Sequence, residues 1–258
     1  MRPQHLDVEI NGFTQREKVI GDHRIQNCLR EVRRLGEDPA LESDERIVRE
    51  KASSAVRSIF EITKLSSVVA DAVDESGAAA LAREILGSEV YVHQSRLNYK
   101  PGFRGGAFYW HADFETWHAE DGMPAPRAVS ASIALTDNHH FNGPLMVMPG
   151  SHRTFLQCSG ATPERYFEES LVEEIPREGV PSEAMISEHY DRHGIEVLTG
   201  AAGSMTVFDS NLLHASSGNI SPVPRANIFV VFNSVENRLV APFAGTAPRP
   251  GFLAARAR

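Results

Sequence analysis

The stretch FYWHADFETWHAEDGMP, residues 108–124, places a histidine and an aspartate two positions apart, at His111 and Asp113. Trp110 and Trp117, the only tryptophans of the chain, flank this pair. Residues i and i+2 of a β-strand point to the same face, so the two side chains would project together into the interior of a barrel-like sandwich. The pair suggests part of a metal site, and ordinary surface polarity beside two core aromatic residues is the alternative.

A metal site of this kind needs a third ligand from elsewhere in the chain. Two histidines and one carboxylate with open coordination positions are typical of non-haem Fe(II) oxygenases, where the open positions take a chelating cosubstrate and dioxygen. The downstream candidates are His118, His139, His140, His152, His189, His193 and His214. His214 is preferred because the segment FDSNLLHASSGN follows an apolar strand-like run, which places it near the mouth of the sandwich.

The rest of the chain predicts a mainly β protein with flanking helices. Residues from about 22 to 87 have helical spacing, and several later runs alternate as strands do. These runs are 89–100, 127–137, 143–151, 203–210 and 225–234. We expect a single domain over residues 1–258, with a helical layer at about 22–87 and a jelly-roll core at about 89–245, interrupted by a helix-and-loop insertion at about 159–194.

Two of these runs carry polar residues on one face. In RANIFVVFN, Arg225, Asn227 and Phe229 share a face of the predicted strand. A buried guanidinium needs a partner, and a dicarboxylate cosubstrate would provide one through a bidentate contact. Exposure on an edge strand is the alternative for Arg225. In YVHQSRLNYK, every second residue from Gln94 to Lys100 is polar, which indicates either a solvated outer face or the wall of a polar pocket.

Composition narrows the classes of partner. The chain has a net charge of −8, and neither nucleic acid nor a membrane surface attracts an acidic protein. No apolar run is long enough to cross a bilayer, and the start of the sequence shows no secretory signal. Cys28 and Cys158 lack the spacing of a metal-ligand pair. We expect free thiols in a reducing cytoplasm, with a disulfide as the alternative.

Four segments resemble the ectoine hydroxylases, a family within the phytanoyl-CoA-hydroxylase-like Fe(II)/2-oxoglutarate dioxygenases. They are WHADFETWHAEDGMP, SASIALTDN, NGPLMVMPGSH and PRANIFVVFNSVENRLVAPF. The resemblance implies a double-stranded β-helix core, which is a cupin-like jelly roll, and a cytoplasmic homodimer. It also implies hydroxylation of ectoine to 5-hydroxyectoine with Fe(II), 2-oxoglutarate and dioxygen.

The same resemblance implies roles for individual residues. The Fe(II) ligands fall on His111, Asp113 and His214, the three residues that the strand argument prefers. The residues implied to bind 2-oxoglutarate are Phe108, Ser132, Arg225 and Asn98. The residues implied to bind ectoine are Gln94, Trp117 and Phe229. Aromatic side chains suit this substrate because its delocalised amidinium cation is attracted to an aromatic face.

Some features near the motif carry other expectations. Ala112 stands where the family usually has serine, and we expect little effect because this side chain should point away from the metal. Residues 1–21 match the family poorly, which suggests a shortened or divergent lid. His118 and Glu120 are expected to be hydrogen-bonded loop residues that set the turn before Gly122, and the alternative is that they are partners of the metal ligands.

Two other functions stay open on the sequence. One is a related dioxygenase that hydroxylates proline or another small amino-acid-like solute, which the metal-binding residues and Arg225 do not exclude. The other is a non-catalytic jelly-roll binding protein. The intact set of His111, Asp113, His214 and Arg225 argues against this second possibility.

Overall fold

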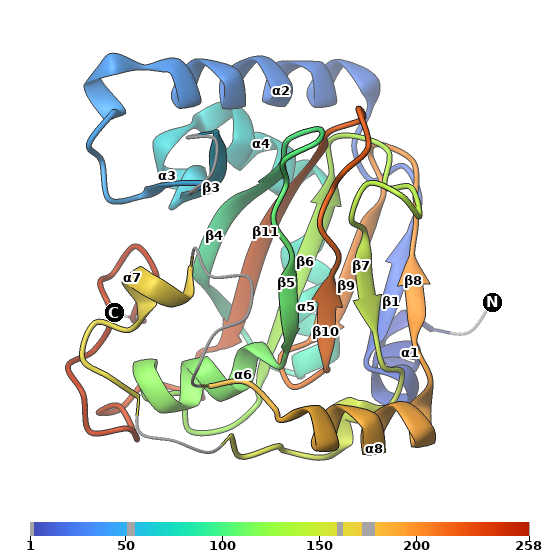
Figure 1. The fold of residues 1–258 in the computed structure, drawn as a ribbon, viewed down its shortest axis with the longest axis vertical. Helices are drawn as coiled ribbons and strands as arrows, with labels where there is room; N and C mark the ends of the chain where they lie inside the picture. Colours follow the sequence, from blue (N-terminus) through green and yellow to red (C-terminus); the bar gives the residue numbers. More distant parts are fainter. Residues whose placement is uncertain (1–2, 51–54, 159–161, 172–178, 258) are drawn as a thin grey trace.

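Two antiparallel sheets form the core of the computed structural model, which describes residues 3–50, 55–158, 162–171 and 179–257 (Figure 1). The strands of the larger sheet are β1 (Phe13–Arg16), β2 (Ile47–Arg49), β3 (Val56–Phe60), β4 (Val90–Lys100), β6 (Ala128–Ala134), β9 (Met205–Asp209) and β11 (Arg225–Ser234). The strands of the smaller sheet are β5 (Phe108–His111), β7 (Leu145–Val147), β8 (Glu196–Leu198) and β10 (His214–Ser216). All five predicted strand runs are confirmed.

The strand orders are those of a jelly roll. The larger sheet runs β1-β9-β6-β11-β4-β3-β2, and the smaller sheet runs β5-β10-β7-β8. Strands adjacent in space are mostly distant in sequence, so the sheets cannot be simple hairpin ladders. The mainly β fold with flanking helices is confirmed.

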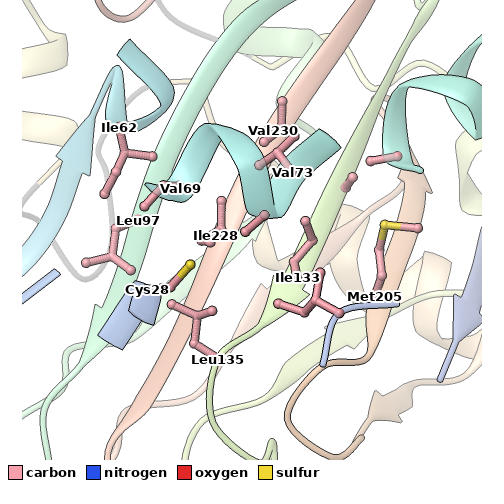
Figure 2. Close-up of a cluster of buried hydrophobic side chains, with 14 of the residues drawn as sticks. Cys28, Ile62, Val69, Val73, Leu97, Ile133, Leu135, Met205, Ile228 and Val230 are labelled. Atoms are coloured by element: carbon pink, nitrogen blue, oxygen red, sulfur yellow. The ribbon is translucent and has the colours of Figure 1, made fainter. Parts of the chain in front are cut away.

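Helices cover the outer face of the larger sheet. They are α2 (Asp22–Glu37), α4 (Ser67–Glu75) and α5 (Ala78–Leu86). Figure 2 shows how Cys28 of α2 and Val69 of α4 approach Leu97 of β4 and Ile228 of β11, all four of them buried. The α5 helix is capped by Gly87, whose φ of 61° is the left-handed conformation that favours glycine.

The N-terminal part of the chain differs from the predicted helical layer. Within residues 22–87, β2 and β3 extend the larger sheet beside β4. The alternation of β3 is obscured by Arg57, which is buried in an ion pair with Glu50. Ahead of them, α1 (Gln4–Asn11) leads into β1, which pairs with β9 and forms the opposite sheet edge. The described part of residues 1–21 therefore completes the sheet, where the sequence suggested a lid.

Of the remaining described helices, only α8 is longer than five residues. They are α3 (Ile62–Leu65), α6 (Asp113–Thr116), α7 (Phe167–Ser170), α8 (Glu183–His193), the π-helical turn η2 (Trp117–Asp121) and the 3-10 turns η1 (Pro39–Leu41) and η3 (Ser151–Arg153). The predicted insertion contains α7 and α8, and its residues 159–161 and 172–178 lie outside the described residues. Part of it is buried, because Phe167 packs in a cluster with Phe60 and Leu253.

The C-terminal segment, residues 235–257, runs back across β4. The Gln94 side-chain amide donates to the Leu253 carbonyl over 2.7 Å. The backbone N–H of Ala255 donates to the His93 carbonyl over 2.8 Å. Among the described helices, none has the length and apolar character needed to span a bilayer. Cys28 and Cys158 are both free, as predicted.

Candidate metal centre and substrate cavity

Two histidines and an aspartate converge where β5 meets β10. One ligand atom from each of His111, Asp113 and His214 lies within 4.8 Å of the other two. His111 and His214 are direct partners in the β5–β10 pairing, which brings their ring centroids to 4.2 Å. The Oδ1 atom of Asp113 is 3.7 Å from His111 Nε2 and 3.9 Å from His214 Nε2. The three predicted ligands therefore meet at one point.

The strand argument for the first two ligands needs one correction. β5 ends at His111, and Asp113 is the first residue of α6. The two side chains still share a direction because Ala112 between them keeps an extended backbone, with φ of −112° and ψ of 128°. The Ala112 side chain packs with Met148 and Leu213, away from the three ligands.

Backbone carbonyls fix the orientation of both imidazoles. The Nδ1 atom of His111 lies 2.6 Å from the Tyr109 carbonyl, and that of His214 lies 2.9 Å from the Leu212 carbonyl. Each Nδ1 therefore carries the proton, which leaves the Nε2 lone pair for a metal. Burial and the neighbouring His214 lower the pKa of His111 to about 4, so this ring stays neutral near pH 7.

Asp113 is held as an ionised ligand. Its Oδ2 atom accepts a hydrogen bond of 3.2 Å from the Ser130 hydroxyl. Burial alone would raise the pKa of the Asp113 carboxyl, but the nearby His214, His111 and Arg96 together lower it. The Oδ1 atom, which faces both imidazoles, remains for a metal.

A cavity opens beside the metal-binding residues. Its wall includes His111 and Asp113 together with Gln94, Arg96, Phe108, Trp117, Glu120 and Arg249. Three predicted residues, Gln94, Phe108 and Trp117, thus line it. Gln94 and Arg96 of the polar face of β4 belong to this wall, and Asn98 and Lys100 of the same face are buried further along the strand. The solvated alternative for that face is therefore wrong.

Arg225 lies deep in the larger sheet and does not line the cavity. Its side chain is 2% exposed, which excludes the edge-strand alternative. Its Nη2 donates to Asn98 Oδ1 over 3.1 Å, and its Nη1 donates to the Gly143 carbonyl. Burial and the like charge of Arg96 lower the pKa of Arg225 to about 9. Such a guanidinium lacks a compensating anion among the described residues.

The other predicted cosubstrate and substrate residues lie on β11 and on its neighbours β4 and β6. The Asn227 amide donates to the Ser132 hydroxyl over 3.0 Å, next to Arg225 on β11. Phe229, two residues further on, is buried behind Arg96, whose guanidinium carbon is 5.4 Å from the ring centroid. Of these residues only Asn98 contacts Arg225 directly, and Ser132 lies opposite Phe229 in the β6–β11 pairing. None of the three lines the cavity as Gln94 and Trp117 do.

Phe108 sits between two cations. The guanidinium carbon of Arg57 is 4.0 Å from its ring centroid, and the Lys100 ammonium is 4.9 Å away. Lys100 is completely buried and donates to the carbonyls of Gly106 and Ser217. These contacts hold the start of β5, and through it His111, against β3 and β4.

Sequence reasoning missed two cavity residues, Arg249 and Arg96, and underestimated Glu120. Arg249 comes from the C-terminal segment, where no periodic pattern draws attention to it. Glu120 is 8% exposed and lies with Oε2 3.9 Å from Arg249 Nε, so it is more than a loop residue. His118 does set the turn before Gly122, because its Nδ1 bonds to the Met123 carbonyl over 2.8 Å. The signal for Arg96 was present in the polar face of β4.

The residues present fit an iron ion and a dicarboxylate. Two imidazoles and one carboxylate are the ligand set of non-haem Fe(II) oxygenases. Nearby, Arg225 Nε is buried without a hydrogen-bond partner in the described part of the chain. Buried polar atoms without partners are costly, so a bound anion that meets the guanidinium would remove a penalty.

A family model for phytanoyl-CoA dioxygenase (PhyH) matches residues 8–227. The chain belongs to the phytanoyl-CoA dioxygenase family. Within this family it resembles the ectoine dioxygenase of Nocardia farcinica, with 58% identity over 246 residues that cover 95% of this chain and 82% of that protein. The ectoine dioxygenase of Streptomyces avermitilis is 52% identical over 248 residues, which cover 96% of this chain and 83% of that protein.

The phytanoyl-CoA dioxygenase fold seen here also matches solved structures. EctD from S. alaskensis, in its apo form and with 2-oxoglutarate and 5-hydroxyectoine, matches with a TM-score of 0.85 and 45% sequence identity. Both matches cover 98% of this chain and 83% of that chain. The resemblance to the ectoine hydroxylases, read from four short segments, is therefore confirmed over nearly the whole chain.

Proposed function

We propose that this protein is an Fe(II)- and 2-oxoglutarate-dependent dioxygenase that hydroxylates ectoine to 5-hydroxyectoine, with release of succinate and CO2. The observation that carries the proposal is the convergence of His111, Asp113 and His214 beside a cavity with an aromatic and cationic wall. The similar proteins support the substrate. They are named ectoine dioxygenases, and the EctD structure from S. alaskensis contains 2-oxoglutarate and 5-hydroxyectoine.

His111, Asp113 and His214 would hold the iron, and the buried residues of the larger sheet would hold 2-oxoglutarate. Arg225, assisted by Asn98 and Ser132, provides the cation for its distal carboxylate. When bound, iron and cosubstrate supply the oxidising chemistry with dioxygen. The chain itself orients the reactants and excludes water from the cavity.

The substrate end of the cavity suits a small zwitterion. Trp117, 3% exposed, offers an aromatic face to the amidinium ring, and Gln94 offers a side-chain amide. Arg96 and Arg249 bring positive charge to the same cavity, where the ectoine carboxylate can be bound. Phe229 contributes from behind Arg96, by holding that guanidinium against its ring.

Anaerobic loading with Fe(II) and 2-oxoglutarate tests the proposal. We expect a metal-to-ligand charge-transfer absorption band that shifts when ectoine is added, followed by ectoine-dependent succinate release in air. His111→Ala and Asp113→Ala should lose the band and turnover, whereas His139→Ala, in a polar turn, should keep both. Full activity of His111→Ala would remove the metal assignment. Turnover of proline in place of ectoine would identify the alternative substrate class.

We also propose that the enzyme works in the cytoplasm as a homodimer, as the family resemblance implies. Free Cys28 and Cys158 agree with a reducing compartment. Light scattering of the purified protein during size-exclusion chromatography tests the dimer, and a mass of one chain would contradict it.

A further inference from the structure

One buried pair lies directly behind the substrate end of the cavity. The side chains of His93 and Asp121 are both 0% exposed, and His93 Nε2 is 3.2 Å from Asp121 Oδ2. Neither residue lines the cavity. Placing a histidine and a carboxylate in the interior is costly unless both make good contacts, so the pair needs a reason.

Asp121 holds the cavity arginine. Its two carboxylate oxygens accept hydrogen bonds from Arg249 Nε over 2.7 Å and from Arg249 Nη2 over 2.6 Å. This bidentate contact fixes the plane of the guanidinium, whose side chain is 7% exposed. Burial alone would raise the pKa of Asp121, but the Arg249 charge and its hydrogen bonds lower it, so the anchor stays ionised.

The anchoring contacts leave one side of Arg249 for the cavity. Nε and Nη2 face Asp121, and Nη1 has no hydrogen-bond partner in the described part of the chain. Glu120, on the cavity wall, is the competing carboxylate, with its Oε2 3.9 Å from Arg249 Nε. Without Asp121, the guanidinium could swing toward Glu120 and neutralise itself there.

His93 connects the same anchor to the cavity tryptophan. Its ring meets the Trp117 ring edge to face, with centroids 5.3 Å apart and an interplanar angle of 67°. Trp117 and Asp121 are the two ends of the π-helical turn η2, a rare conformation that is frequent at functional sites. The His93 carbonyl also accepts the Ala255 N–H, which ties down the segment that carries Arg249.

We propose that His93 and Asp121 are positioning residues that set Arg249 and Trp117 in the orientation that binds ectoine. The inference rests on the proposed function, because it assigns these two wall residues to the substrate. The same buried pair then fixes both the Arg249 guanidinium and the Trp117 ring. A small zwitterion needs both at a fixed spacing, so substrate selectivity depends on residues that never touch it.

Two substitutions separate this role from simple structural support. Asp121→Asn keeps the side-chain shape but removes the charge and one of the two acceptors for Arg249. His93→Phe keeps a ring against Trp117 but cannot donate to Asp121. His189→Phe is the matched control, since His189 of α8 is 2% exposed and does not line the cavity.

Ectoine and 2-oxoglutarate binding should respond differently in these variants. In Asp121→Asn we expect the KM for ectoine to rise at least tenfold, and in His93→Phe by a smaller factor. The affinity for 2-oxoglutarate, followed by the anaerobic charge-transfer band, should stay within twofold of the parent. A Trp110→Phe background leaves Trp117 as the single tryptophan, so its fluorescence reports the ectoine Kd without turnover.

The outcomes are distinct. An ectoine KM and Kd within twofold of the parent in folded Asp121→Asn and His93→Phe would overturn the inference. If the binding of ectoine and of 2-oxoglutarate weakens equally in these variants, and Tm falls as much as in His189→Phe, the pair has a structural role. That result would also overturn the inference. If Asp121→Asn does not fold, His93→Phe carries the test. A parent enzyme that does not hydroxylate ectoine would overturn the proposed function instead.

Discussion

At the scale of single residues, Arg225 shows how burial gives one side chain a specific role. It is almost fully buried, its Nε has no hydrogen-bond partner among the described residues, and burial lowers its pKa to about 9. A positive charge in this position destabilises the empty protein and attracts an anion. In the proposed function, relief of this energetic cost contributes to the binding of the 2-oxoglutarate carboxylate.

Arg225→Lys should therefore weaken 2-oxoglutarate binding selectively. Lysine keeps the charge but cannot reproduce the planar, two-pronged contact of a guanidinium. Loss of one charge-assisted hydrogen bond, about 1.5–3 kcal/mol, predicts a rise in the KM for 2-oxoglutarate of roughly 10- to 150-fold. Succinate release measured against each reactant in turn checks this, with the exposed Arg192→Lys as control. A larger rise in the ectoine KM would mean that the two ends of the site are assigned the wrong way round.

Asp209, at the end of β9, should make stability depend on pH. Burial raises its pKa to about 7, although the Asn211 N–H, which it accepts over 2.7 Å, lowers it somewhat. In the unfolded chain this carboxyl ionises from its ordinary value of 3.8. The unfolded state thus releases a proton that the native state keeps, so the stability from Asp209 is present below about pH 4 and lost progressively as pH rises to about 7.

Asp209→Asn removes this dependence because the amide stays neutral and still accepts from Asn211. We expect the variant to exceed the parent in unfolding free energy by about 4 kcal/mol at pH 8, and by much less near pH 4. Urea unfolding at the two pH values measures the difference. A gain that is the same at both would show that the carboxyl is not protonated in the native state.

At the scale of elements, β11 shows how far sequence reasoning extends. Its alternation correctly separated Arg225 and Phe229 from Ile228, which packs under the helices. The matching polar face of β4 stayed ambiguous, because only the pairing of β4 with β11 shows that it is an inner wall. That pairing joins segments more than a hundred residues apart and leaves no local pattern.

The missed features have the same physical origin. β2 and β3 were read as part of a helical layer since they are short and carry a buried ion pair in place of clean alternation. The Asp121–Arg249 contact joins residues 128 positions apart, and a bidentate pair between distant polar side chains has no periodicity. The convergence of His111, Asp113 and His214 was predictable because their spacing and strand ends are local properties.

The two faces of β11 should separate stability from activity. Ile228 is 0% exposed and packs beneath the helical layer, so Ile228→Ala should lower the free energy of unfolding by about 2–5 kcal/mol. The KM values for ectoine and 2-oxoglutarate should stay within twofold, because this side chain points away from the cavity. Urea unfolding and steady-state kinetics give the two numbers. Val92→Ala is the control, because Val92 of β4 is 39% exposed. Its free energy of unfolding should change by close to zero.

At the scale of the whole molecule, the proposed site spans both sheets. His111 and His214 belong to the smaller sheet, whereas Arg225 lies in the middle of the larger one. Iron alone would link β5, α6 and β10, which are already paired or adjacent. A cosubstrate that reaches Arg225 from the metal would link the two sheets directly. Loading should therefore stabilise the jelly roll in two separable steps.

Thermal unfolding under anaerobic conditions tests this division. Ligand at about one hundred times its Kd adds roughly 2.7 kcal/mol of stability, which corresponds to a rise in Tm of about 5–10 °C for a domain of this size. We expect one increment with Fe(II) and a second when 2-oxoglutarate is added. Arg225→Lys should keep the first increment and lose most of the second, because the metal ligands are intact and the contact on the larger sheet is weakened. His214→Ala should lose both, since a cosubstrate that is held through the metal needs the complete ligand set. If Arg225→Lys retained the full second increment, 2-oxoglutarate would be held by the smaller sheet alone, and the jelly roll would not be closed by its own cosubstrate.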